Sequence, residues 1–125
     1  MQRRVLPAVL AGFAALGLAA CQQEPQRTVV VVPSQACDTS FRVVNNSGLT
    51  VERLYFSHSS LGAWGADQLG TSVLPPGRFV NYRANNAGNY DFRVVWTNGQ
   101  AAELRGVNIC RASQITVTNR GLVAT

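Results

Sequence analysis

The chain has 125 residues, of which 46% are hydrophobic, and its 11 basic and 6 acidic side chains give a net charge of +5. This length leaves room for one domain with a modest core and excludes a second domain of similar size. Every basic residue is an arginine, and no run or stripe of them forms the cluster that nucleic acid requires, so we expect no nucleic-acid partner.

Residues 1–20 have the three parts of a secretory signal peptide. Arg3 and Arg4 form the basic start, Val5 to Leu18 is apolar, and Ala19 and Ala20 are small residues suited to cleavage. The apolar stretch is shorter than the roughly 20 residues that a membrane-crossing helix needs. We therefore predict that residues 1–20 are removed; an uncleaved anchor helix and a twin-arginine signal are the alternatives.

Leu18-Ala19-Ala20-Cys21 resembles the lipobox of bacterial lipoproteins. The resemblance implies that Cys21 becomes the first residue of the mature protein and carries acyl chains, palmitate among them. The partner of that residue is then the membrane itself. Gln22 stands where an Asp would retain a Gram-negative lipoprotein in the inner membrane. The resemblance therefore implies an outer-membrane location facing the periplasm.

Residues 21–36 comprise the lipidated Cys and a polar, proline-punctuated tether. Fully extended at about 3.4 Å per residue, the tether reaches roughly 50 Å. Val29 to Val32 interrupt it with four β-branched side chains, which favour an extra edge strand or a contact with a partner.

Residues 37–125 are predicted to form one all-β domain, because short β-rich runs alternate with turn residues and no 3.6-residue period is sustained. The strongest strand is Tyr90 to Thr97, and Asn98-Gly99 after it favours a type I′ hairpin turn. The other expected strands cover residues 41–45, 50–57, 72–74, 78–83, 100–105, 107–110 and 114–118. Seven to eight short strands predict a single small antiparallel β-sandwich of immunoglobulin-like shape, with a small β-barrel as the alternative.

Cys37 and Cys110 flank nearly the whole domain. In an oxidising compartment an even pair of cysteines predicts one disulfide, which would add roughly 4 kcal/mol of stability by closing so long a loop. The sequence shows no His or Cys at ligand spacing near them, so we expect neither a thiolate metal site nor a cofactor.

The loop around Trp64 contains the best candidate binding surface. Trp64 and Asp67, together with Tyr55 and Tyr82, could form an aromatic platform for a glycan or a peptide. The alternative is structural: Trp64 closes one end of the sandwich, and Asp67 fixes the loop by accepting hydrogen bonds from backbone amides.

His58 is the only histidine, and serines flank it on both sides. Neighbouring residues of a strand point to opposite faces, whereas the members of a catalytic triad converge from distant segments. We therefore expect no catalytic residue here and predict that the protein is not an enzyme; a small hydrolase is the weakest alternative.

Six short motifs of the domain resemble a family of small uncharacterised secreted bacterial β-domains. They are Asn46-Ser47-Gly48, Trp64-Gly65-Ala66-Asp67-Gln68-Leu69-Gly70, Leu74-Pro75-Pro76-Gly77, Tyr90-Asp91-Phe92-Arg93, Asn98-Gly99 and Asn108-Ile109-Cys110. Members of that family often have a Cys shortly before the Tyr-Asp pair, where this chain has Gly88 and Asn89 and offers Cys37 instead. The resemblance implies a secreted β-fold without an established activity. The predicted function is a lipid-anchored envelope accessory protein, structural or protein-binding; a glycan- or peptidoglycan-binding module is the alternative.

Overall fold

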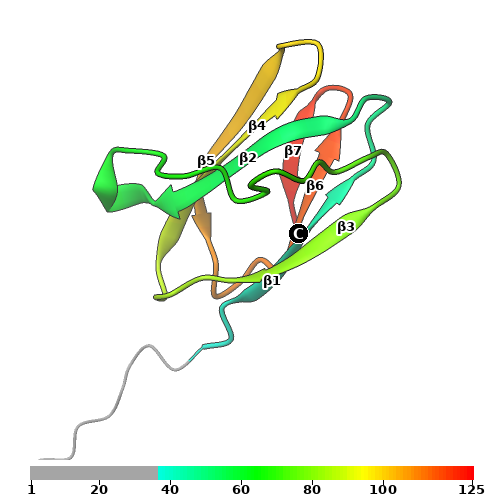
Figure 1. Cartoon of the computed structure of the whole chain (residues 1–125). Helices are drawn as coiled ribbons and strands as arrows, with labels where there is room; N and C mark the ends of the chain where they lie inside the picture. Colours follow the sequence, from blue (N-terminus) through cyan, green and yellow to red (C-terminus); the bar gives the residue numbers. More distant parts are fainter. Residues whose placement is uncertain (1–36) are drawn as a thin grey trace, which may run out of the picture. The chain divides into compact units, whose positions relative to one another are not determined.

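The computed structural model describes residues 37–125 (Figure 1). The predicted signal peptide, the predicted acylation site Cys21 and the predicted tether with Val29 to Val32 lie outside the described residues. Residues Gln35–Thr125 form a compact unit. In the described part, no helix has the length and apolarity needed to cross a membrane.

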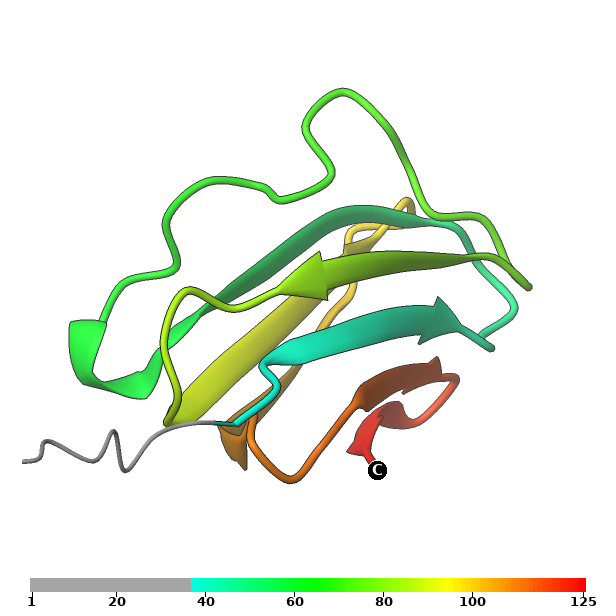
Figure 2. The same ribbon diagram turned by 90° about the horizontal axis from the view of Figure 1, so that it is seen from below.

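Seven strands form two sheets that face each other (Figures 1 and 2). They are β1 (Ser40–Asn45), β2 (Val51–His58), β3 (Phe79–Arg83), β4 (Asn89–Trp96), β5 (Ala101–Asn108), β6 (Gln114–Thr118) and β7 (Gly121–Ala124). One sheet has the order β3-β1-β6-β7 and the other β2-β4-β5. All neighbours are antiparallel except β1 and β6, which run parallel. The predicted β-sandwich is confirmed, and the barrel alternative is wrong.

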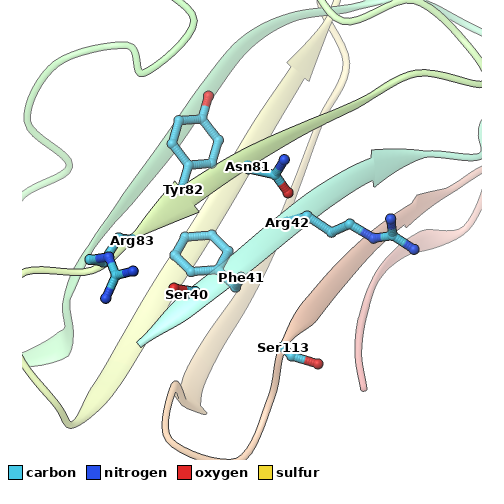
Figure 3. A pocket seen from close by; sticks show the side chains of 7 residues that line it. All are labelled: Ser40, Phe41, Arg42, Asn81, Tyr82, Arg83 and Ser113. Carbon is cyan, nitrogen blue, oxygen red and sulfur yellow. The ribbon is translucent and has the colours of Figure 1, made fainter. Parts of the chain in front are cut away.

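The core lies between the sheets and follows from the period-2 alternation of the strands. On β4, Phe92, Val94 and Trp96 point inward and are 8% exposed or less. The ring of Phe41 on β1 packs edge-on against Phe92 at 5.5 Å, which joins the two sheets. Tyr82 on β3 lies opposite Phe41 in the same sheet (Figure 3).

A buried polar cluster closes one side of this core. Asn45 is completely buried, and its Nδ2 donates to the carbonyl oxygens of Leu49 at 2.8 Å and Leu74 at 2.9 Å. Its Oδ1 accepts from the hydroxyl of Ser47, which in turn accepts from Nε1 of Trp96 at 2.9 Å. Trp96 therefore lies in the core with its indole N–H satisfied, as a buried donor requires.

Two strand predictions need correction. The runs expected at 100–105 and 107–110 merge into the single strand β5, which ends at Asn108, so Ile109 and Cys110 lie in a turn. Gly106 at φ 70° accompanies a register shift between Tyr90 and Phe92 that does not end the pairing. The strand expected at 72–74 is reduced to an isolated bridge between Leu74 and Val51. The prolines that follow Leu74 cannot donate ladder hydrogen bonds.

The long connection between β2 and β3 begins with a 3₁₀ turn, η2 (Ser59–Leu61), and runs along the side of β2 (Figure 2). The backbone N–H of Gln68 donates to the carbonyl of Leu54 at 2.7 Å. This loop therefore covers the free edge of β2, which protects the edge from pairing with another chain.

The predicted disulfide between Cys37 and Cys110 is confirmed, with Cα atoms 5.5 Å apart. It joins the residue that leads into β1 to the turn between β5 and β6. The unit thus contains its own core and its own cross-link, so it has what a domain needs to fold alone.

Candidate functional site

A groove of about 570 Å³ opens between the loop after β2 and the turn from β3 to β4. Its lining combines aromatic rings from Phe56, Trp64 and Tyr90 with side-chain amides from Gln68, Asn85 and Asn86. Arg83 supplies the only permanent charge among the described residues that line it. Concave sites that pair apolar rings with a few oriented polar groups are typical of ligand binding.

His58 ends β2 and forms part of the groove wall. Its Nδ1 accepts from the backbone N–H of Ser60 at 3.2 Å and lies 2.7 Å from the Ser60 hydroxyl. Its ring meets Tyr90 edge-on at 5.2 Å. A Cβ on Gly88 would approach Nε2 of His58 to 2.5 Å, so only glycine fits there. Within residues 37–125 no hydrogen bond joins His58 to a carboxylate.

Tyr90 holds the turn from β3 to β4, which forms one side of the groove. Its hydroxyl donates to the carbonyl of Asn86 at 2.9 Å and accepts from the N–H of the same residue at 3.3 Å. The Tyr90 ring itself is only 5% exposed. The turn that presents the Asn85 and Asn86 amides is therefore tied to the core through one side chain.

Trp64 lies against the outer face of the three-stranded sheet. Leu54 is buried in the core, so Tyr55 next to it points outward by strand alternation, and its ring centroid is 6.4 Å from that of Trp64. The guanidinium carbon of Arg105 stands 4.9 Å from the Trp64 ring centroid, a cation–π contact. The half-buried indole therefore rests on a sheet face and does not close an end of the sandwich.

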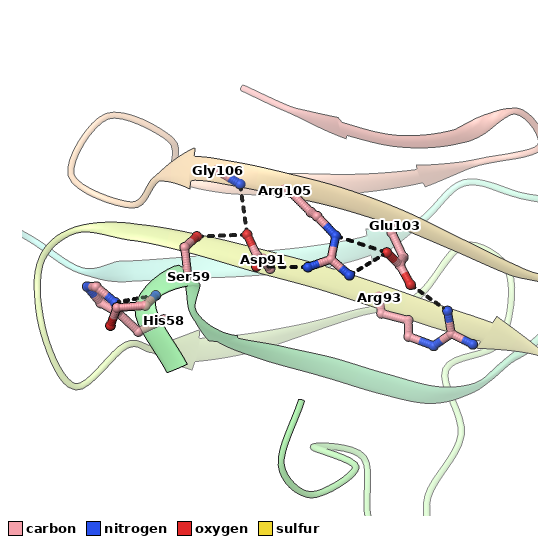
Figure 4. Close-up of polar contacts among 8 residues, drawn as sticks. His58, Ser59, Asp91, Arg93, Glu103, Arg105 and Gly106 are labelled. Carbon is pink, nitrogen blue, oxygen red and sulfur yellow. Dashed lines mark hydrogen bonds and ion pairs between the residues drawn. The ribbon is translucent and has the colours of Figure 1, made fainter. Parts of the chain in front are cut away.

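An ion-pair network on β4 and β5 supports this arrangement (Figure 4). Arg105 pairs with Asp91 at 3.2 Å and with Glu103 at 2.8 Å, and Glu103 pairs with Arg93 at 2.7 Å. Arg105 on β5 thus pairs with Asp91 on the neighbouring strand β4. Arg105 is held in place from two sides below Trp64, which limits the positions open to the indole.

Asp91 is the most buried member of the network, with 9% of the residue exposed. Its Oδ1 accepts from the hydroxyl of Ser59 at 2.7 Å and from the N–H of Gly106 at 2.9 Å. The Ser59 hydrogen bond, with those from Gly106 and Arg105, lowers the pKa of Asp91 against the opposing effect of burial. An ionised Asp91 thus ties the start of the Trp64 loop to β5.

Asp67 and Tyr82 hold the loop rather than extend the aromatic surface. One carboxylate oxygen of Asp67 accepts from the N–H of Leu69 at 3.0 Å, which confirms a predicted hydrogen bond to a loop amide, and from the N–H of Leu54 on β2 at 3.0 Å. The hydroxyl of Tyr82 donates to the carbonyl of Gln68 at 3.3 Å. Burial, with the charge of Asp67 adding to it, raises the pKa of Tyr82 to about 12.

The structure brings two of the four predicted surface residues, Tyr55 and Trp64, together. Tyr90, Arg83 and Arg105 are not predicted from the sequence as parts of the site. A two-residue Asn98-Gly99 turn would pair Arg93 with Leu104, whereas the structure pairs Arg93 with Glu103. The loop has three residues, Thr97 to Gly99, between Trp96 and Gln100, so the predicted type I′ turn is wrong. The shift at Gly106 that brings Arg105 beside Asp91 has no signal in the sequence.

Among residues 37–125 no group of three or more His, Cys, Asp or Glu side chains is placed to hold a metal ion. Searches against family models, curated proteins and solved structures find no match to this chain.

Proposed function

We propose that this protein is a lipid-anchored accessory protein of the bacterial cell envelope, which binds a partner protein without catalysing a reaction. Acyl chains on Cys21 hold it to the outer membrane on the periplasmic side, as the lipobox resemblance implies. The domain that follows the tether presents the groove beside Trp64 to the partner. The groove is the observation that carries the binding part of this proposal.

The geometry of Trp64 supports a binding role. A large aromatic ring that is already fixed loses little conformational entropy when a partner covers it. Arg105 and Tyr55 fix the indole from below, while Leu61 at the groove rim is 68% exposed. Aromatic residues with exposed apolar neighbours are enriched at the centre of protein interfaces.

The bonding of Asp91 favours a role without catalysis. As the possible third member of a Ser–His–Asp set, Asp91 would have to orient His58. Its oxygens instead accept from Ser59 and Gly106 and pair with Arg105. The disulfide favours an oxidising compartment such as the periplasm.

The anchor is tested by mass spectrometry of the native protein extracted from membranes. We expect an N-terminal peptide that begins at Cys21 and carries acyl chains. An intact chain beginning at Met1, or a soluble species without acyl chains, would contradict the anchor.

The groove is tested by photo-crosslinking in intact cells. A photoreactive residue at Leu61 should give a discrete adduct that is lost in Trp64→Ala and retained in Trp64→Phe. The same residue at Leu49, in the turn between β1 and β2 and 42% exposed, is the control. Equal adducts from both positions, or no change in Trp64→Ala, would overturn the assignment of the groove.

A glycan, peptidoglycan in particular, is the second candidate ligand. The observation in its favour is the combination of the Trp64 ring with the amides of Gln68, Asn85 and Asn86, which suits stacking and hydrogen bonding to a sugar. Soluble peptidoglycan fragments should then shift the tryptophan fluorescence of the wild type but not that of Trp64→Phe. An unchanged wild-type spectrum removes this candidate.

A further inference from the structure

A second surface lies on the outer face of β1 and β3, in the four-stranded sheet. The register pairs Ser40 with Arg83 and Arg42 with Asn81. Directly paired residues of antiparallel strands point to the same side, so these four side chains share one face. They surround a shallow basin of about 580 Å³, to which Ser113 also contributes (Figure 3).

The polar groups of this basin are mainly hydrogen-bond donors. Arg42 and Arg83 bring two guanidinium groups, and neither forms an ion pair within the described part of the chain. Figure 3 shows the two side chains extending in opposite directions, with Arg42 toward β6, where its Nε donates to Oε1 of Gln114 at 2.9 Å, so they present two separate cations on one face. One exposed carboxylate, that of Asp38, stands near Arg83, and the hydrogen bond from the N–H of Ser40 is the main reason its pKa is lowered.

Apolar side chains lie on the same face as the cations. Phe79 is 51% exposed, and the guanidinium carbon of Arg42 stands 4.9 Å from its ring centroid. The register places Phe79, Val44, Thr116 and Val123 in one row across the four strands. An exposed aromatic ring beside arginine suits the boundary between lipid headgroups and acyl chains.

We infer that this face of the β3-β1-β6-β7 sheet rests on anionic phospholipid headgroups. Arg42 and Arg83 bind the phosphates, and Phe79 reaches the apolar boundary. The inference rests on the proposed lipid anchor, which keeps the domain near a membrane. Cys37, the described residue that follows the predicted tether in the sequence, stands three positions before Ser40 of the basin.

The strength expected of this contact is modest. Each arginine near an anionic surface raises partition about fivefold, so Arg42 and Arg83 together contribute about 25-fold. Such a contact is weak for a free protein but sufficient for one that a tether of about 50 Å holds at a high local concentration.

The test uses the unacylated unit Gln35–Thr125, which contains the whole core and both disulfide cysteines. It is sedimented with vesicles of phosphatidylcholine alone or mixed with phosphatidylglycerol. We expect binding that requires phosphatidylglycerol and falls about 25-fold in Arg42→Gln/Arg83→Gln. The matched control is Arg53→Gln/Arg111→Gln, which has the same net charge and should lose little binding.

Three outcomes would overturn the inference. One is the absence of any preference for phosphatidylglycerol, and another is an equal loss in the two double variants, since either removes the role of this face. The third is a change in the NMR signals of the β1 and β3 backbone amides on adding inorganic phosphate, with no sedimentation on vesicles. That result would mark a free anion as the ligand. Because this unit has no acylation site, its result is independent of whether Cys21 is acylated, and mass spectrometry of the full chain decides that separately.

Discussion

Removal of the disulfide should destabilise the domain strongly through the unfolded state. The bond joins residues separated by 73 positions, and closing a loop of that length restricts the unfolded chain by about 4 kcal/mol at 25 °C. Cys110 is exposed and Cys37 half-buried, so replacing both with serine leaves no cavity in the core. The loss of unfolding free energy therefore measures the entropy of closing the loop and not a change in core packing.

Total stabilities of small domains are only about 5–15 kcal/mol, so this loss is a large share. With a urea dependence of about 1–3 kcal/mol per molar, the midpoint of unfolding of Cys37→Ser/Cys110→Ser should fall by roughly 1–4 M. The dependence on urea should also become steeper, because the unfolded chain without the bond exposes more surface.

The assay is urea unfolding of the unit Gln35–Thr125, followed by tryptophan fluorescence. The wild type under reducing conditions should reproduce the double variant, since both lack only the cross-link. Equal midpoints for the oxidised wild type and the variant would refute the reasoning. Two titratable thiols in the unreduced wild type would refute the bond itself.

Three further predictions concern single residues of the site. Asp91→Ala should lower the free energy of unfolding by about 2 kcal/mol at pH 7, because it removes the acceptor for Ser59, Arg105 and Gly106. Because the folded pKa of Asp91 is lowered, this difference is full above about pH 5 and shrinks as the pH falls through that pKa; equal losses at pH 7 and pH 3 would contradict it. Tyr82 should titrate at about 12 in an absorbance titration of the folded protein. Its contribution to stability is therefore present below about pH 10 and is lost as the pH rises toward 12. An absorbance titration of Tyr82→Phe with the same shape as that of the wild type would exclude this. Gly88→Ala should lower the free energy of unfolding by roughly 1–3 kcal/mol in urea, because Gly88 has a φ of 127° and a Cβ there would approach His58. Adding His58→Ala should restore only part of that free energy. Full restoration would show that the backbone at residue 88 is not strained.

The strands that the sequence predicts well are those with a buried face and a polar face. β4 is predicted because Phe92, Val94 and Trp96 alternate with outward residues over its whole length. β7 is not predicted, because Gly121–Ala124 has four residues and too little alternation to mark a strand. It is the second strand of a tight hairpin in which Thr118 of β6 pairs with Gly121, and the intervening Asn119-Arg120 lacks the Asn-Gly signal of such a turn.

The groove is harder to predict because segments distant in the sequence build its wall. Its wall combines His58, Trp64, Arg83 and Tyr90, which come from β2, β3, β4 and a loop. A sequence shows that Trp64 lies among glycines, but not that Arg105 will support its ring. The register shift at Gly106 decides that position, and it becomes visible only when the two strands are paired.

The two proposed surfaces share Arg83 but can be separated by single substitutions at other residues. Arg42 lines only the basin on β1 and β3, and Trp64 rests on β2-β4-β5, whereas Arg83 lines both the basin and the groove. The outer faces of two stacked sheets point in opposite directions, so a domain resting on lipid through one sheet leaves the other accessible. Arg42→Gln should therefore weaken vesicle binding and leave crosslinking from Leu61 unchanged, while Trp64→Ala should do the reverse. If either variant weakens both activities while its unfolding midpoint stays that of the wild type, the two surfaces are one site, and the assignment of separate roles is wrong.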